Sequence, residues 1–341
     1  EKSLLHLIND GLMVLFFYVV GLEIKREMLG GELSTPKKAA LSIYGAIGGM
    51  VVPALFYVFF NQGGDFARGW GIPMATDIAF AVGVLTLLGK RAPMALRIFL
   101  LALAIVDDLG AVLVIAFFYT SELFTDYLGV AAMALFVLTL LNRAGLRHPA
   151  IGMTFGLVTW YAFLKSGVHA TIAGVLLAFL TPNHAPGTAR AEVSRRDTSY
   201  LDNLIHSLHP VVTWFIMPVF AFFNAGVTFG GIGMGELFAN PVTLGIMTGL
   251  FFGKPIGVVG LTYVMVRFKL AELPKGINWG HIIGGGFLAG IGFTMALFVS
   301  GLAFGGLAIE PFSKLGILMG STMAALLGLS FLAFMPTKEE G

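Results

Sequence analysis

The sequence contains no cysteine, and only 12% of its 341 residues carry a charge. The absence of cysteine excludes disulfides, thiol catalysis and cysteine-based metal sites. Soluble domains are about 25% charged and about 45–50% apolar, whereas this chain is 57% hydrophobic, with a mean hydropathy of +0.87. Too few charged side chains remain to solvate the surface of a globule of this size. The composition therefore excludes a soluble enzyme, a disordered chain and a coiled coil, and it predicts a bundle of transmembrane helices.

The chain also has almost no excess of positive over negative charge, since its net charge is only +2. It therefore gives no indication of nucleic-acid binding. Glycine is abundant instead. The chain has 45 glycines, close to twice the average share of about 7%. In membrane proteins this abundance indicates close helix packing and interrupted helices.

Long apolar runs predict how often the chain crosses the bilayer. A transmembrane helix needs about 20 mostly apolar residues. The runs between charged or turn-forming clusters predict eleven spans, at residues 4–22, 39–60, 71–88, 94–119, 127–141, 150–164, 166–180, 211–229, 242–266, 280–304 and 313–334. The runs do not alternate between apolar and polar residues, which argues against a β-barrel. The predicted fold class is an all-α, polytopic membrane protein that forms one domain, residues 1–341.

The basic residues of the loops predict the orientation through the positive-inside rule. Fifteen Lys and Arg residues fall in loops 23–38, 89–93, 142–149, 181–210 and 267–279 and in the C-terminal tail, and three fall in the opposite set of loops. This bias places the C-terminus in the cytoplasm and residue 1 outside. A start outside the membrane without a signal peptide suggests that a leading segment is missing. Residues 181–210 are the only long polar stretch and are interpreted as a cytoplasmic linker.

Asp107 and Asp108 lie in the middle of the apolar run 94–119. A charge at mid-membrane costs about 2.5–3.5 kcal/mol, so such residues are functional by default. Two carboxylates in one low-dielectric cavity repel each other and titrate as a coupled pair. Deprotonated, they offer oxygen ligands to a small cation, and protonated, they cannot hold one. The pair therefore predicts a site where protons and a cation compete. The alternative is a structural pair buried against Arg or Lys.

Lys254 is the basic residue that lies deepest in a predicted span, within 242–266. A buried lysine loses its proton readily, so it can pair with a carboxylate in one state and release it in another. The alternative is a lysine that extends to the membrane interface. A phosphate-binding loop is excluded, because the glycine spacing is wrong and Pro255 occupies the position where Ser or Thr would bind magnesium.

Asp77 follows Pro73 and Thr76 in the run 71–88. Pro73 removes a backbone hydrogen bond and so favours an interrupted helix. A carboxylate at Asp77 offsets the partial positive charge at the start of a half-helix, and Thr76 supplies hydroxyl and carbonyl oxygens. The glycine-rich run 284–294 fits a second interrupted helix, and it fits close helix packing through small residues equally well.

Broken spans in matching positions indicate a transporter with inverted-topology repeats and an ion site at mid-membrane. Residues 39–119 hold three spans, of which the second is interrupted by proline and the third carries the acidic pair. Residues 242–334 also hold three spans, with Lys254 in the first and the glycine-rich run in the second. The sequence therefore predicts two inverted repeats, 39–119 and 242–334.

Several motifs together resemble the NhaA family of sodium/proton antiporters, in the same order and over essentially the whole chain. They are Gly21-Leu-Glu-Ile-Lys-Arg-Glu27, Thr76-Asp77-Ile-Ala-Phe-Ala, Ala104-Ile-Val-Asp-Asp-Leu-Gly110, Leu164-Lys-Ser-Gly-Val-His-Ala-Thr171, Pro218-Val-Phe-Ala-Phe-Phe-Asn-Ala-Gly-Val227, Gly253-Lys-Pro-Ile-Gly257 and Gly290-Ile-Gly-Phe-Thr294. The resemblance implies a secondary active transporter of the bacterial inner membrane that exports sodium or lithium in exchange for protons by alternating access. It implies no enzyme activity and no resident cofactor.

The resemblance also implies roles for individual residues. Those matching Asp107 and Asp108 bind the cation and the protons. Those matching Asp77 and Lys254 balance charge where two broken helices cross. The family forms homodimers through a segment before its second span. This chain is expected to begin at that second span, which puts dimer formation in doubt.

Four further residues match positions that the family uses for pH control, namely Glu23, Glu27, His169 and His209. Taken alone, Glu23 and Glu27 fit a solvated helix end on the cytoplasmic side, and each histidine fits a capping or interfacial role. The family often has an acidic residue four positions before the last of these histidines, where this chain has Ile205. That departure weakens the implied role of His209.

We expect the acidic pair to release its protons at high cytoplasmic pH, to take one cation from inside and to receive two protons from outside, so that exchange is electrogenic. Two other functions fit part of the pattern. An intramembrane aspartyl protease could use Asp77 as its second aspartate, but it gives Lys254 no role. A sodium-coupled symporter for an organic solute would call for further polar residues at mid-membrane.

Overall fold

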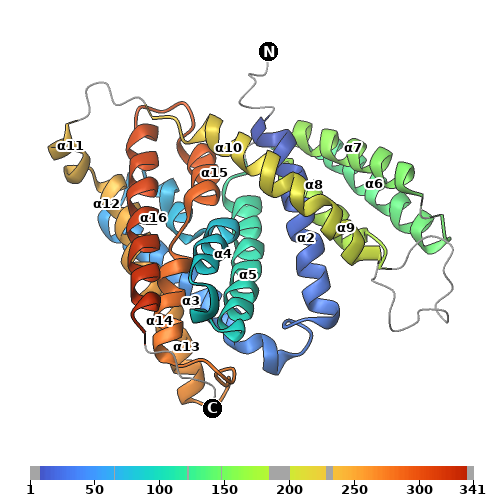
Figure 1. The fold of residues 1–341 in the computed structure, drawn as a ribbon. Coiled ribbons are helices and arrows are strands. Elements are labelled where there is room, and N and C mark those ends of the chain that lie inside the picture. Colours follow the sequence, from blue (N-terminus) through green and yellow to red (C-terminus); the bar gives the residue numbers. More distant parts are fainter. Residues whose placement is uncertain are drawn as a thin grey trace. The chain divides into compact units, whose positions relative to one another are not determined.

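The computed structural model describes residues 8–64, 66–120, 123–146, 148–183, 200–227 and 233–335 (Figure 1). Within these ranges the chain is built of helices and contains no strand, so the predicted all-α fold class is confirmed. The predicted linker 181–210 lies partly outside the described residues, which omit 184–199. Two compact units are distinguished. Unit 1 comprises residues 1–31 and 112–223, and unit 2 comprises residues 32–111 and 224–341.

Eight of the eleven predicted spans are long and apolar enough in the described part of the chain to cross a membrane. Seven helical segments meet this condition, and a pair of helices bent by 44° makes an eighth if it is counted as one span. The other three predicted spans also contain helices, α2 (Met13–Gly30), α7 (Pro149–Ser166) and α8 (Thr171–Leu180). With ten residues, α8 is about 15 Å long, half the thickness of the hydrocarbon core.

Unit 1 contains α2, α7 and α8. Its remaining elements are η1 (Ile8–Leu12), the end of α5 (Met94–Phe118), α6 (Thr125–Arg143), α9 (Tyr200–Val211), η4 (Val212–Ile216) and α10 (Met217–Asn224). The short connection between α7 and α8 turns at Gly167, whose φ of +86° is costly for any residue with a Cβ. That glycine therefore separates two helices where the apolar sequence is nearly continuous.

Glycines bring α2 and α8 together within unit 1. A Cβ at Gly174 would collide with the backbone of α2 at Val14 and Tyr18, and a Cβ at Gly21 would collide with Ala178. The same pair of helices buries Leu22 and Ala178 in an apolar cluster with residues of α9. Close backbone approach through small residues is the usual way in which transmembrane helices associate.

Unit 2 contains the helices of both predicted repeats, up to Ala111 in α5. Its elements are α3 (Pro36–Phe60), η2 (Ala67–Met74), α4 (Ile78–Leu87), η3 (Gly89–Arg91), α5, α11 (Met234–Ala239), α12 (Pro241–Thr248), η5 (Gly249–Gly253), α13 (Lys254–Arg267), α14 (Trp279–Ala289), α15 (Phe293–Phe304) and α16 (Glu310–Ala333) (Figure 1). The inverted relation between 39–119 and 242–334 stays a prediction.

The helices of unit 2 pack closely where glycine faces glycine. A Cβ at Gly48 of α3 would collide with the carbonyl of Gly257 in α13, and a Cβ at Gly257 would collide with that of Gly48. Around this crossing lies a large apolar cluster that includes Leu96, Leu103 and Val258, each fully buried. The tight packing fixes α13 against α3 and so fixes the position of Lys254, the first residue of α13, relative to α3.

Candidate cation and proton site

The two predicted interruptions are both present in unit 2. The first separates η2 from α4, and the chain is extended at Ala75 and Asp77. It follows Pro73 by two residues, in agreement with the predicted effect of a proline that cannot donate a backbone hydrogen bond. The second separates α14 from α15 at residues 290–292, where the helix axis bends by 44°. The glycine-rich run therefore forms a break, and it also packs closely, since a Cβ at Gly286 would touch Pro255.

Four hydrogen bonds connect the two breaks. The Asp77 amide donates to the Ile291 carbonyl at 2.7 Å, and the Thr76 hydroxyl donates to the Ala289 carbonyl at 2.8 Å. In return, the amide of Thr294 donates to Oδ2 of Asp77 at 3.1 Å, and the Thr294 hydroxyl donates to the same oxygen. Each interruption therefore satisfies part of the backbone groups that the other one removes from its helix.

Asp77 lies at the start of two half-helices at once. Its Oδ1 accepts from the amide of Phe80 at 3.1 Å, which makes it the N-cap of α4, and its Oδ2 accepts from Thr294 in the first turn of α15. The side chain is fully buried. Helix N-termini carry a partial positive charge that a carboxylate stabilises. Asp77 therefore lies at the start of the half-helix where the sequence suggested it, and it also caps a second half-helix that the sequence did not suggest.

Asp107 forms an ion pair with Lys254. The ammonium donates to both oxygens of the Asp107 carboxylate, at 2.9 and 3.1 Å, and it also donates to the carbonyl of Met74. Both side chains are inaccessible to solvent, at 1% and 0% exposure. Met74 is the last residue of η2, so the lysine contacts the negative end of a half-helix as well as the carboxylate. Such a pair is stable because each charge has the other, and removing one partner is costly.

Asp108 is fully buried on α5 beside Asp107, and its charge acts on the Lys254 ammonium. Successive residues on a helix point about 100° apart, so the two carboxylates leave α5 in different directions. Thr76 lies next to the Asp107 carboxylate. The structure therefore brings together Asp107, Lys254 and Thr76 around the first break, with Asp108 on the neighbouring position of α5.

Comparison with known proteins identifies the family. The family described as Na+/H+ antiporter 1 matches residues 1–332 of the chain. The chain belongs to this family. It is 49% identical to the Na(+)/H(+) antiporter NhaA of Aeromonas salmonicida over 343 residues, which cover 99% of this chain and 84% of that relative. The corresponding protein of Shewanella loihica is 49% identical over 100% of this chain and 85% of its own length. That of Salmonella typhi is 49% identical over 97% of this chain and 84% of its own length.

Membership of this antiporter family confirms the predicted resemblance. Its curated members are transporters and not enzymes, so the aspartyl-protease hypothesis is set aside. Together with the apolar helices, the family makes this chain a multi-pass membrane protein.

Two residues of the site were not assigned a role from the sequence. Thr294 was noted only as the end of a glycine-rich motif, yet it binds Asp77 through both its amide and its hydroxyl. Ser321 lies on α16, and its hydroxyl accepts from the amides of Gly292 and Phe293 in the second break. A polar residue beside a predicted break was the available signal for Thr294. For Ser321 the sequence carries no signal that distinguishes it from the other serines of its span.

The residues expected to control pH lie in unit 1, on separate elements. Glu23 and Glu27 are in the last two turns of α2, and Arg26 contacts Glu27 at 3.3 Å. His169 lies between α7 and α8, and its Nε2 is 2.9 Å from the carbonyl of Tyr119. His209 is near the end of α9, and its Nδ1 is 3.3 Å from the hydroxyl of Thr213.

Glu23 follows the predicted span 4–22 directly. Burial raises the pKa of its carboxyl from 4.5 to about 7, where Arg26 opposes the rise and Glu27 adds to it. The carboxyl of Glu23 therefore changes its charge near neutral pH, which the carboxyl of an exposed glutamate does not do.

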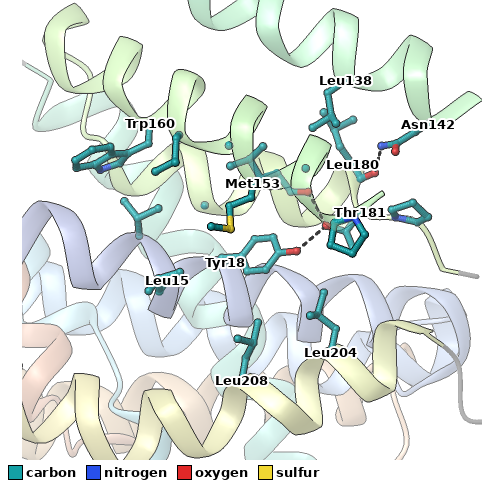
Figure 2. Close-up of a pocket in the computed structure, with 18 of the residues that line it drawn as sticks. Leu15, Tyr18, Leu138, Asn142, Met153, Trp160, Leu180, Thr181, Leu204 and Leu208 are labelled. Carbon is teal, nitrogen blue, oxygen red and sulfur yellow. Dashed lines mark hydrogen bonds between the residues drawn. The ribbon is translucent and has the colours of Figure 1, made fainter. Parts of the chain in front are cut away.

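Unit 1 also contains a cavity of about 470 Å³ between α2, α6, α7, α8 and α9 (Figure 2). Its wall is mainly apolar, with Leu15, Met153 and Trp160 among the lining residues. At one end, the hydroxyl of Tyr18 is 3.0 Å from that of Thr181. No aspartate, glutamate, lysine or arginine lines it within the part of the chain that the structure describes, so it is distinct from the carboxylate site of unit 2.

Proposed function

We propose that the protein exports Na+ or Li+ from the cytoplasm in exchange for protons, across the inner membrane of a bacterium and with its C-terminus inside. Membership of the antiporter family supports the exchange itself. The observation that carries the assignment of the site is the buried ion pair of Lys254 with Asp107, next to Asp108 and to the two interrupted helices. Interrupted helices around buried ionisable groups are typical of ion sites in secondary transporters.

Competition between protons and the cation follows from the chemistry of the two carboxylates. Deprotonated Asp107 and Asp108 present hard oxygen ligands that suit a small alkali cation. Protonation removes the negative charge and converts an acceptor oxygen into a donor. The cation must also replace the Lys254 ammonium at Asp107, and the carbonyl of Met74 then remains as a partner for that ammonium.

Exchange of one cation for two protons moves one net positive charge inward. A membrane potential that is negative inside then drives export, at about 2.3 kcal/mol per charge per 100 mV. Alternating access is achieved when the loaded site turns outward, releases the cation and takes up the protons. At high cytoplasmic pH the carboxylates are deprotonated more often, so that export is regulated by pH.

Sodium exchange in proteoliposomes tests the assignment. Asp108→Asn is expected to lower the rate at least about 100-fold, because the neutral amide cannot exchange a proton for the cation. The matched control is Asp126→Asn, which removes an exposed aspartate at the start of α6 and leaves exchange unchanged. Undiminished exchange by Asp108→Asn contradicts the assignment of the site.

The stoichiometry is tested with Lys254→Ala. If Asp107 and Asp108 carry both protons, this variant shifts the pH dependence of exchange and remains electrogenic. A potential-sensitive dye in the same proteoliposomes reports the charge movement. Electroneutral exchange by Lys254→Ala would show that Lys254 itself carries one of the protons.

A further inference from the structure

We propose that Ser321 is a positioning residue for cation exchange, which holds the second break in the conformation that supports Asp77 and Thr76. The inference rests on the proposed function of the carboxylate site. Ser321 lies in the middle of α16 and is 4% exposed. Its Oγ accepts from the amide of Gly292 at 3.2 Å and from the amide of Phe293 at 3.1 Å.

These two amides belong to the start of a half-helix, where backbone N–H groups have no partner within the helix. Ser321 accepts the first two, and Asp77 accepts the third, from Thr294. One neutral hydroxyl and one carboxylate therefore accept three of the four free amides at the start of α15. Without the hydroxyl, one buried and one partly buried donor lose their acceptor, and the chain at residues 292 and 293 must move to find another.

A movement there reaches the cation site through short connections. The residues just before these two amides provide carbonyls that bind the first break. The carbonyl of Ile291 accepts from the amide of Asp77, and the carbonyl of Ala289 accepts from the hydroxyl of Thr76. Thr76 in turn lies beside the Asp107 carboxylate. Ser321 is thus connected to Asp107 through the backbone of the second break and one threonine, although it does not belong to the carboxylate site.

The packing of α16 explains how a side chain as short as serine reaches the break. A Cβ at Gly320 would lie 3.1 Å from the backbone of Met247, and a Cβ at Gly328 would lie 2.9 Å from the side chain of Leu288. These glycines bring α16 close to α12 and α14. Ala324, one turn after Ser321, is fully buried. A hydroxyl on this face is therefore within reach of the break.

The apparent KM for Na+ in proteoliposomes tests the inference. Ser321→Ala is expected to raise it about fivefold to tenfold, with the maximal rate less affected, since the loss of the two hydrogen bonds to this hydroxyl has an effect of this order. Ser321→Thr keeps the hydroxyl and restores the KM. The matched control is Ser313→Ala, which removes another fully buried hydroxyl from α16, where it is 2.5 Å from the Ser300 hydroxyl.

A purely structural role gives a different result. Ser321→Ala and Ser313→Ala would then lower the melting temperature alike and leave the KM for Na+ unchanged, which overturns the inference. If Ser321→Ala does not reach the membrane, Ser321→Cys replaces it, because sulfur is a weak acceptor. A KM for the Cys variant equal to that of Ser321→Thr also overturns it. Failure of the proposed function itself is recognised separately, by unchanged exchange in Asp108→Asn.

Discussion

The break between η2 and α4 and the break between α14 and α15 lie against each other in unit 2, but the groups that hold them differ in charge. The first break lies beside Asp107 of α5, and Asp77 caps α4, the half-helix that follows the break. The second break is held by Ser321, a neutral hydroxyl on α16, and by the same Asp77. The first break therefore lies among several ionisable groups, whereas the second shares only Asp77 with it and is attached to α16 through a neutral hydroxyl.

This difference assigns a distinct role to each break. Under the proposed function, a cation or a proton that binds at Asp107 changes the electrostatic environment of the first break and of the Lys254 ammonium, which is paired with Asp107. The hydrogen bonds from Gly292 and Phe293 to Ser321 carry no charge and keep their strength in either state. We therefore propose that the first break responds to the bound cation or proton, whereas the second gives it a fixed support.

The largest expected effect comes from the charge at the first break. Asp107→Asn leaves the Lys254 ammonium buried without its bonded carboxylate, which typically costs about 3–5 kcal/mol. Exchange is lost and the melting temperature in detergent falls strongly. The double variant Asp107→Asn/Lys254→Met removes both charges and is expected to recover most of the stability without recovering exchange. A single variant as stable as the parent protein would show that the pair contributes no stability.

An intermediate effect is expected where the two breaks share one acceptor. The carboxylate of Asp77 caps two helix starts, and Asp77→Asn leaves only one carbonyl oxygen for both. The variant is expected to lower the free energy of unfolding by about 1–3 kcal/mol. Combined with Ser321→Ala, it is expected to deviate from additivity by at least about 0.5 kcal/mol in the free energy of unfolding, because both residues hold the start of α15. Additive effects would mean that the two sets of contacts are independent.

The smallest effect is expected at Glu23, which belongs to unit 1, whereas both breaks belong to unit 2. The raised pKa of Glu23, about 7 in the folded protein against 4.5, means that the folded state binds a proton more tightly than the unfolded state. Its contribution to stability is complete below pH 4.5 and is lost as the pH rises through 7, with a slope of at most about 1.4 kcal/mol per pH unit.

Melting temperatures between pH 5 and pH 8 check this contribution. Glu23→Gln is expected to lose less stability over the range than the parent protein. The control Glu236→Gln, at an exposed position on α11, is expected to follow the parent. Parallel curves for Glu23→Gln and the parent protein would contradict the assigned titration.

The first break could be predicted from the sequence because its cause is local. Pro73 cannot donate a backbone hydrogen bond, and Asp77 is a strong helix cap, so both signals lie within five residues of each other. The buried charges were equally visible, since Asp107, Asp108 and Lys254 stand out in apolar runs. The hypothesis that Lys254 is the partner of an aspartate agrees with its contacts in the structure.

The rest depends on contacts between distant segments. Ser321 and Gly292 are 29 residues apart, and Thr294 and Asp77 are 217 residues apart, so no local pattern relates them. The glycine-rich run left a break and close packing equally possible, because glycine favours both, and the structure contains both. The predicted span 166–180 was also longer than its helix, since the turn at Gly167 replaces the first part of it.

Proton release on Na+ binding tests the central claim most directly. Purified protein in a weakly buffered detergent solution is titrated with Na+ while a dye reports the pH. We expect about two protons to be released for each Na+ bound when the carboxylates are protonated at the start, and none from the double variant Asp107→Asn/Asp108→Asn. Binding of Na+ without proton release, or equal release from the double variant, would contradict competition between the cation and protons for these two side chains.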